Sequence, residues 1–93
     1  MLREDPKDAF LIYALALECQ KVGDLAETRK LLLQLRDEQS DYLATYYQLG
    51  KVYENAGEDD KALEAYRQGI EVAERQGDAK TKGELELAIW ELE

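Results

Sequence analysis

The stretch TYYQLGKVYENAGE, from Thr45 to Glu58, places two tyrosines side by side in a segment with helical spacing. Successive residues of a helix point about 100° apart, so one packing contact cannot bury both Tyr46 and Tyr47. The apolar positions at i, i+3, i+4 and i+7 are Tyr46, Leu49, Gly50 and Tyr53. Tyr46 is therefore expected in the core, and Tyr47 is expected to face another direction.

The composition favours helix along the whole chain. The 93 residues include one proline and six glycines, and good helix formers such as alanine, leucine, glutamate and lysine are abundant. No alternation of β-branched residues indicates a strand. A chain of this length suits one small domain, residues 1–93, whose free energy of unfolding is about 5 to 15 kcal/mol. The sequence predicts a single all-α domain.

The charge of the chain is strongly acidic, with 21 acidic and 12 basic residues and a net charge of −9. This charge opposes binding to the phosphate backbone of nucleic acids and to anionic membrane surfaces. Two explanations of the acidity remain open at this stage: adaptation to high salt, and the ordinary acidity of many cytosolic proteins.

The apolar run AFLIYALAL, from Ala9 to Leu17, resembles the apolar core of a signal peptide. An export signal has a positive start, but here the preceding acidic residues Glu4, Asp5 and Asp8 outnumber Arg3 and Lys7. The run is also too short to cross a bilayer. With a single cysteine in the chain, we expect a reducing, cytoplasmic setting.

An internal repeat appears when the sequence is shifted by 34 residues. The shift superposes Tyr13 on Tyr47, Leu15 on Leu49, Gly23 on Gly57 and Gln34 on Gln68. It predicts two copies, at about residues 9–42 and 43–76, followed by a further helix over about 78–92.

Turn and capping signals divide the chain into five helices, expected at residues 6–21, 25–37, 41–55, 59–76 and 79–92. The expected start signals are Asp5 with Pro6, Asp24 with Glu27, Ser40 or Asp41, and Asp59 with Asp60. Gly23 and Gly57 stand where a helix ends in a left-handed residue, and Gly77 separates the last two helices.

These residues resemble the tetratricopeptide repeat signature W-x2-L-G-x2-Y…A-x3-F. The matching positions are Tyr46-x2-Leu49-Gly50-x2-Tyr53 and Ala62-x3-Tyr66, and a degenerate earlier copy is Ile12-x2-Leu15-Ala16-x2-Cys19 and Thr28-x3-Leu32. The closing proline of the family is replaced by Ser40 and Glu74. The resemblance covers residues 5–76. It implies antiparallel helix pairs stacked as a short right-handed α-solenoid, with a capping helix at the C-terminal end.

Catalysis is not expected from this composition. The chain has no histidine, one serine and one cysteine, so nucleophile–base pairs and nitrogen or sulfur metal sites cannot be assembled, and no cofactor is expected. Cys19 shares the core stripe of Ile12, Leu15 and Ala16, which favours a buried small hydrophobe over a reactive thiol. Glu58-Asp59-Asp60 is interpreted as a helix start, because it lacks the ligand spacing of a calcium loop.

The resemblance implies that the first helices of the repeats line a concave groove that receives peptides. Helical spacing from Tyr13 and Tyr47 extends this face to Phe10, Ala14 and Leu17 in the first helix and to Ala44, Gln48, Lys51 and Glu54 in the third. The alternative is that Phe10, Tyr13 and Leu17 only complete packing between neighbouring helices.

The expected function is that of a non-catalytic adaptor that binds a partner protein. Some family members hold the acidic tails of heat-shock chaperones with a basic clamp, but Tyr13 and Leu17 stand where lysine and asparagine would be needed. An acidic chain with an aromatic groove is expected to take an apolar or mildly basic segment, either as an extended peptide or as a short helix.

The fifth helix departs from the repeat register. A third copy in register would place Lys80, Gly83, Glu84 and Leu87 in the core, whereas a shifted register gives the apolar face Leu85, Ala88, Ile89 and Leu92. Leu87 and Trp90 then lie nearly opposite that face. Two interpretations follow: Trp90 packs near Ile70 and Ala73 of the fourth helix, or Leu87 and Trp90 form a homodimer contact or dock a following segment.

Overall fold

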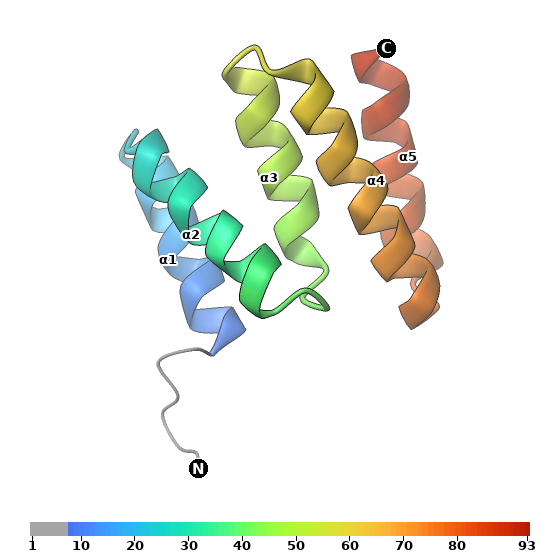
Figure 1. Ribbon diagram of the computed structural model, residues 1–93, viewed down its shortest axis with the longest axis horizontal. Helices are drawn as coiled ribbons and strands as arrows, with labels where there is room; N and C mark the ends of the chain where they lie inside the picture. The colour runs from blue at the N-terminus through green and yellow to red at the C-terminus, as the bar shows by residue number, and fades with distance from the viewer. Residues whose placement is uncertain (1–7) are drawn as a thin grey trace. The chain divides into compact units, whose positions relative to one another are not determined.

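The computed structural model describes residues 8–93, and α-helix is the only regular secondary structure in that part of the chain. The helices are α1 (Ala9–Lys21), α2 (Leu25–Glu38), α3 (Ala44–Asn55), α4 (Asp59–Gln76) and α5 (Ala79–Leu92) (Figure 1). The all-α prediction is confirmed. The chain divides into two compact units, one ending at Tyr42 and holding α1 and α2, the other running from Leu43 to Glu93.

Most helix boundaries follow the local signals. The Asp24 carboxylate accepts a hydrogen bond from the Glu27 N–H at 3.2 Å and starts α2, and α4 and α5 have the expected bounds. The turns after α1, α3 and α4 contain Gly23, Gly57 and Gly77 with φ of 85°, 76° and 70°. A side chain in this left-handed region is strained, so glycine is the fitting residue at these turns.

The predicted helix starts at residues 5–6 and 40–41 have different outcomes. Asp5 and Pro6 lie outside the described residues; within residues 8–93, α1 begins at Ala9, and the Asp8 carboxylate accepts from the Phe10 N–H at 2.9 Å. The prediction that Ser40 or Asp41 starts the third helix is wrong. The chain instead turns where the Tyr42 N–H donates to the Gln39 carbonyl at 2.9 Å, and α3 begins only at Ala44.

The first unit is a helix pair in which α1 packs against α2. Ile12 and Ala16 of α1 are buried, and the buried Thr28 hydroxyl of α2 donates to the Asp24 carbonyl at 2.9 Å and lies 3.5 Å from the Ala16 carbonyl. The prediction that Leu15 belongs to this core is wrong, because Leu15 is 52% exposed. It points about 100° away from Ala16, and the contact with α2 does not reach that side of α1.

In the second unit, α4 packs against both α3 and α5 (Figure 1). The predicted α3 stripe is confirmed, since its members Tyr46, Leu49, Gly50 and Tyr53 are all buried. Gly50 has the packing reason that its place in a helix requires: a Cβ there would overlap the ring of Tyr66 on α4. Close approach of α3 and α4 therefore depends on this glycine.

The register shift of α5 is confirmed. Leu85 and Ala88 are buried, and Ile89 and Leu92 are partly buried. Trp90 is 76% exposed and Leu87 is 55% exposed, so the interpretation that packs Trp90 against α4 is wrong. The reason is geometric: α5 turns its Leu85 side to α4, and Trp90 projects from nearly the opposite side. No helix among residues 8–93 is both long and apolar enough to cross a membrane.

Candidate functional site

Tyr47 of α3 is partly buried, and its ring is held by two neighbours. The ring centroid of Tyr66 on α4 lies 6.1 Å away, at an interplanar angle of 48°. The Lys51 ammonium, one turn further along α3, lies 5.3 Å from the centre of the Tyr47 ring. The contact with Tyr66 restricts the ring, while the rest of it stays accessible to a ligand.

A hollow of about 360 Å³ opens beside Tyr47 in the second unit. Its other lining residues all come from α5 and are Glu84, Leu87, Ala88 and Glu91. Their spacing of i, i+3, i+4 and i+7 places them on one side of the helix. The hollow is therefore lined by the aromatic ring of Tyr47, the apolar side chains of Leu87 and Ala88, and the carboxylates of Glu84 and Glu91.

A polar network supports the α3 side of this hollow. The Tyr66 hydroxyl donates a hydrogen bond to the Glu54 carboxylate, and Lys51 lies 3.8 Å from the same carboxylate. Burial, followed by the bond to Glu54, raises the pKa of Tyr66, so its phenol stays neutral. Because Lys51 is engaged by Glu54 and Tyr47, the exposed carboxylates Glu84 and Glu91 give the hollow an acidic rim.

Sequence reasoning named part of this site. Tyr47 was expected to face a partner, and Leu87 was named only as a possible oligomer contact. Glu84 and Glu91 were not named as site residues, although their common face with Leu87 and Ala88 was a usable signal. The remaining α3 residues predicted to line a groove, Ala44, Gln48, Lys51 and Glu54, are all partly buried.

The predicted site residues of α1 lie in the first unit. Phe10 is 64% exposed, whereas Tyr13 and Leu17 are partly buried. The Tyr13 ring centroid lies 5.6 Å from that of Tyr42, which follows α2. The contact with Tyr42 restricts the Tyr13 side chain, whereas Phe10 projects from α1 into solvent.

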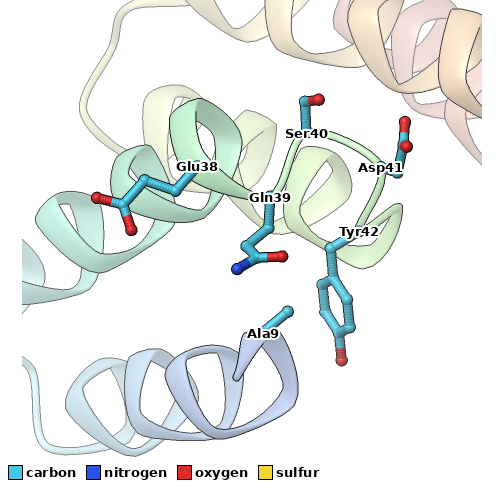
Figure 2. A pocket seen from close by; sticks show the side chains of 6 residues that line it. All are labelled: Ala9, Glu38, Gln39, Ser40, Asp41 and Tyr42. Carbon is cyan, nitrogen blue, oxygen red and sulfur yellow. The ribbon is translucent and has the colours of Figure 1, made fainter. Parts of the chain in front are cut away.

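A second pocket of about 400 Å³ lies at the same end of the first unit. It is lined by Ala9 and by the consecutive residues Glu38, Gln39, Ser40, Asp41 and Tyr42. Figure 2 shows the Gln39 and Tyr42 side chains directed toward the start of α1, whereas Ser40 and Asp41 point away from it. The pocket is thus mostly formed by one turn, whose Tyr42 ring packs on Tyr13.

No catalytic or metal-binding constellation emerges from the described residues. Within residues 8–93, no group of three or more potential ligand side chains is placed to hold a metal ion. Burial raises the pKa of the Cys19 thiol, and the carboxylates of Asp24, Glu27 and Glu18 raise it further. The thiol therefore stays protonated near neutral pH, which disfavours nucleophilic chemistry.

Comparison with solved structures places these features in a family. The solution structure of a tetratricopeptide repeat domain protein from Salinibacter ruber matches with a TM-score of 0.92 and 42% identity, over 97% of this chain and 91% of that one. The chain belongs to the tetratricopeptide repeat family. A crystal structure of such a domain protein from the same organism matches with a TM-score of 0.87 and 40% identity, over 91% of this chain and 94% of that one.

A more distant tetratricopeptide repeat match shows the fold alone. The crystal structure of MamA gives a TM-score of 0.67 at 24% identity, over 95% of this chain and 60% of that one. No protein-family model and no curated protein matches the sequence. Membership of the tetratricopeptide repeat family makes the chain a protein-interaction module in general terms, of a kind that is typically non-catalytic.

Proposed function

We propose that the second unit binds a basic and apolar segment of a partner protein in the hollow beside Tyr47. The observation that carries this proposal is the meeting of the Tyr47 ring with Glu84, Leu87, Ala88 and Glu91 around one hollow. Its volume of about 360 Å³ falls within the range of about 300 to 1,000 Å³ that is usual for ligand sites.

The chemistry of the hollow fits an arginine or lysine side chain with an apolar neighbour. The aliphatic stem of the basic residue packs on Leu87 and Ala88, as long charged side chains do on apolar surfaces. Its cation pairs with the carboxylates of Glu84 and Glu91, while the Tyr47 ring, which the Lys51 ammonium already contacts, packs against the apolar neighbour. The net charge of −9 also attracts a basic segment at long range and disfavours nucleic acid and anionic membranes.

The first unit offers an aromatic and apolar face of its own. Phe10 projects from α1, and Tyr13 and Leu17 lie partly exposed on the same helix. We propose this face as a second contact for a partner, because a tyrosine held by a ring contact, beside an exposed phenylalanine, suits an interface that is partly apolar and partly hydrated.

The single cysteine supports the further proposal of a reducing, cytoplasmic setting.

Self-assembly through Leu87 and Trp90 is the second candidate function. The exposure of both side chains favours it. The exposed Glu84, Glu86 and Glu91 beside them oppose it: they outnumber the one exposed lysine on this side, Lys80, so two copies that met here would bring together more like than opposite charge. Binding of a basic partner has no such cost and is the better-supported function.

Selection from a displayed library of random peptides tests the main proposal. We expect the selected peptides to share an arginine or lysine next to an apolar residue. Tyr47→Ala and the double variant Glu84→Gln/Glu91→Gln should each weaken binding about tenfold or more, which corresponds to about 1.4 kcal/mol. Glu71→Gln, an exposed α4 change outside the hollow, is the matched control and should bind like the native chain.

Thermal melts separate lost binding from lost folding. Tyr47→Ala should cost only about 1 kcal/mol of stability, whereas Tyr46→Ala, in the core, should cost about 3 to 5 kcal/mol. Selected peptides without basic residues, or peptides that bind the folded Tyr47→Ala variant as well as the native chain, would refute the proposed site.

A further inference from the structure

The outer side of α5 carries a stripe that nothing in the described chain covers. Gly83, Leu87 and Trp90 stand at i, i+4 and i+7 and so share one helix face. Leu87 and Trp90 are exposed, and a Cβ added at Gly83 would meet no atom within 4 Å. These three residues form the outer α5 face.

The glycines inside helices show what such a position does in this protein. Residues 8–93 contain three of them: Gly50, Gly69 and Gly83. A Cβ at Gly50 would overlap the Tyr66 ring, and one at Gly69 would lie 2.7 Å from Tyr46 Cβ and 2.9 Å from Leu85 Cδ1. At these two positions, a neighbouring helix packs against the glycine. Gly83 likewise leaves space at the helix surface, but no helix of the described chain occupies that space.

The charges beside the outer α5 face indicate what fits there. Helical spacing places the exposed Glu84 and Glu91 along one edge of the stripe and the exposed Glu86 along the other. One positive charge, Lys80, lies on the first edge, one turn before Glu84, and Glu93, which follows α5, lies 3.9 Å from Arg67. Around Leu87 and Trp90 the edges carry glutamates, so the stripe is complementary to a helix with an apolar stripe between lysines or arginines. A second copy of the chain would bring the same excess of glutamate over lysine to the contact and is therefore the poorer match.

We propose that the outer α5 face docks a basic amphipathic helix of a partner protein. The apolar stripe of that helix covers Leu87 and Trp90, and one of its large side chains enters the opening at Gly83. This inference goes beyond the proposed function, because it assigns a second surface that does not involve Tyr47. Leu87, Glu84 and Glu91 border both surfaces, so Trp90 and Glu86 are the residues that report on the outer face alone.

A synthetic helical peptide provides the probe. It carries leucines at i, i+4 and i+7, lysines on both sides of them and no tryptophan. Two control peptides have the same length: one replaces every lysine with glutamate, and the other keeps the composition but scrambles the order. Trp90 is the only tryptophan of the chain, so its emission should shift to the blue when the basic helix binds, and neither control should cause this shift.

Calorimetric titration of folded variants localises the contact. Trp90→Ala should weaken binding of the basic helix about tenfold or more, and Glu86→Lys about threefold or more. The matched controls are Val22→Ala, an exposed apolar change in the first unit, and Glu64→Lys, an exposed charge reversal on α4. Both controls should bind within about twofold of the native chain.

Several outcomes would overturn the proposal. Equal binding of the scrambled peptide would mean attraction by net charge only. Loss of binding in Tyr47→Ala but not in Trp90→Ala would place the peptide in the hollow of the second unit, and this result would leave the proposed function standing. A sedimentation mass of the chain alone that rises with concentration, and does not rise for Trp90→Ala, would assign the face to a homodimer.

Discussion

Tyr66 connects the core of the second unit to its candidate site. Its ring fills the space left by Gly50, contacts the ring of Tyr47, and carries the hydroxyl that donates to Glu54. Burial and this hydrogen bond raise the pKa of Tyr66, which means that the folded protein favours the neutral phenol. Removing the hydroxyl should therefore affect both stability and its dependence on pH.

Tyr66→Phe should lower the free energy of unfolding by about 1.5 to 3 kcal/mol at neutral pH, because a hydrogen bond to a charged group is lost. The folded-state pKa lies above the unfolded-state value of about 10, so this contribution is fully present below about pH 10 and is lost as the pH rises further. Urea unfolding from neutral to alkaline pH should show the native and variant stabilities converging. A constant difference between them across this range would contradict the assignment.

At the level of the helices, glycine has opposite effects in different places. In α3, Gly50 permits the approach of α4, because any larger residue would overlap Tyr66. In α5, Gly83 has no neighbour within the described chain, so in the isolated protein it weakens the helix without relieving any clash. The same substitution should therefore give results of opposite sign in the two helices.

Gly50→Ala should destabilise the protein by about 1 to 3 kcal/mol through overpacking. Gly83→Ala should stabilise it by about 0.5 to 1 kcal/mol, since alanine is the better helix former and meets no clash. Thermal and urea unfolding of the two variants, compared with the native chain, measure both effects. A loss of stability in Gly83→Ala would mean that this side of α5 is already in contact in the isolated chain.

For the molecule as a whole, the dominant long-range property is the net charge of −9. Glu84, Glu86 and Glu91 of α5 are exposed and contribute to this charge, which Lys80 and Lys82 near the start of the helix partly offset. Self-repulsion of this kind disfavours the compact state, and it also draws basic partners toward the protein. Both effects weaken as salt screens the charges.

Raising sodium chloride from about 0.05 to 1 M, where the Debye length falls to about 3 Å, should raise the melting temperature. A variant with Glu64→Lys and Glu71→Lys carries less negative charge on exposed α4 positions, so its melting temperature should rise less. Differential scanning calorimetry of both proteins checks this. A melting temperature that stays flat or falls with salt would show that self-repulsion is not a significant term.

The sequence by itself determined the features that depend on local chemistry. The turns at Gly23, Gly57 and Gly77 follow from backbone conformation, and the start of α2 follows from the Asp24 carboxylate. The buried stripe that begins at Tyr46, and the shifted register of α5, follow from helical periodicity. In each case the deciding residues lie within a few turns of one another, so no knowledge of distant contacts was needed.

Only the tertiary structure decided which side of each apolar helix is covered. The pattern of α1 allowed Leu15 to be buried, and that of α5 allowed Trp90 to pack on α4, but both are exposed. The candidate site depends on the same kind of information: Tyr47 and Leu87 stood out in the sequence, whereas the meeting of Tyr47 with Glu84 and Glu91 required the packing of α3 and α5 around α4. The physical reason is that periodicity defines the faces of a helix, while the neighbouring helices determine which face loses contact with water.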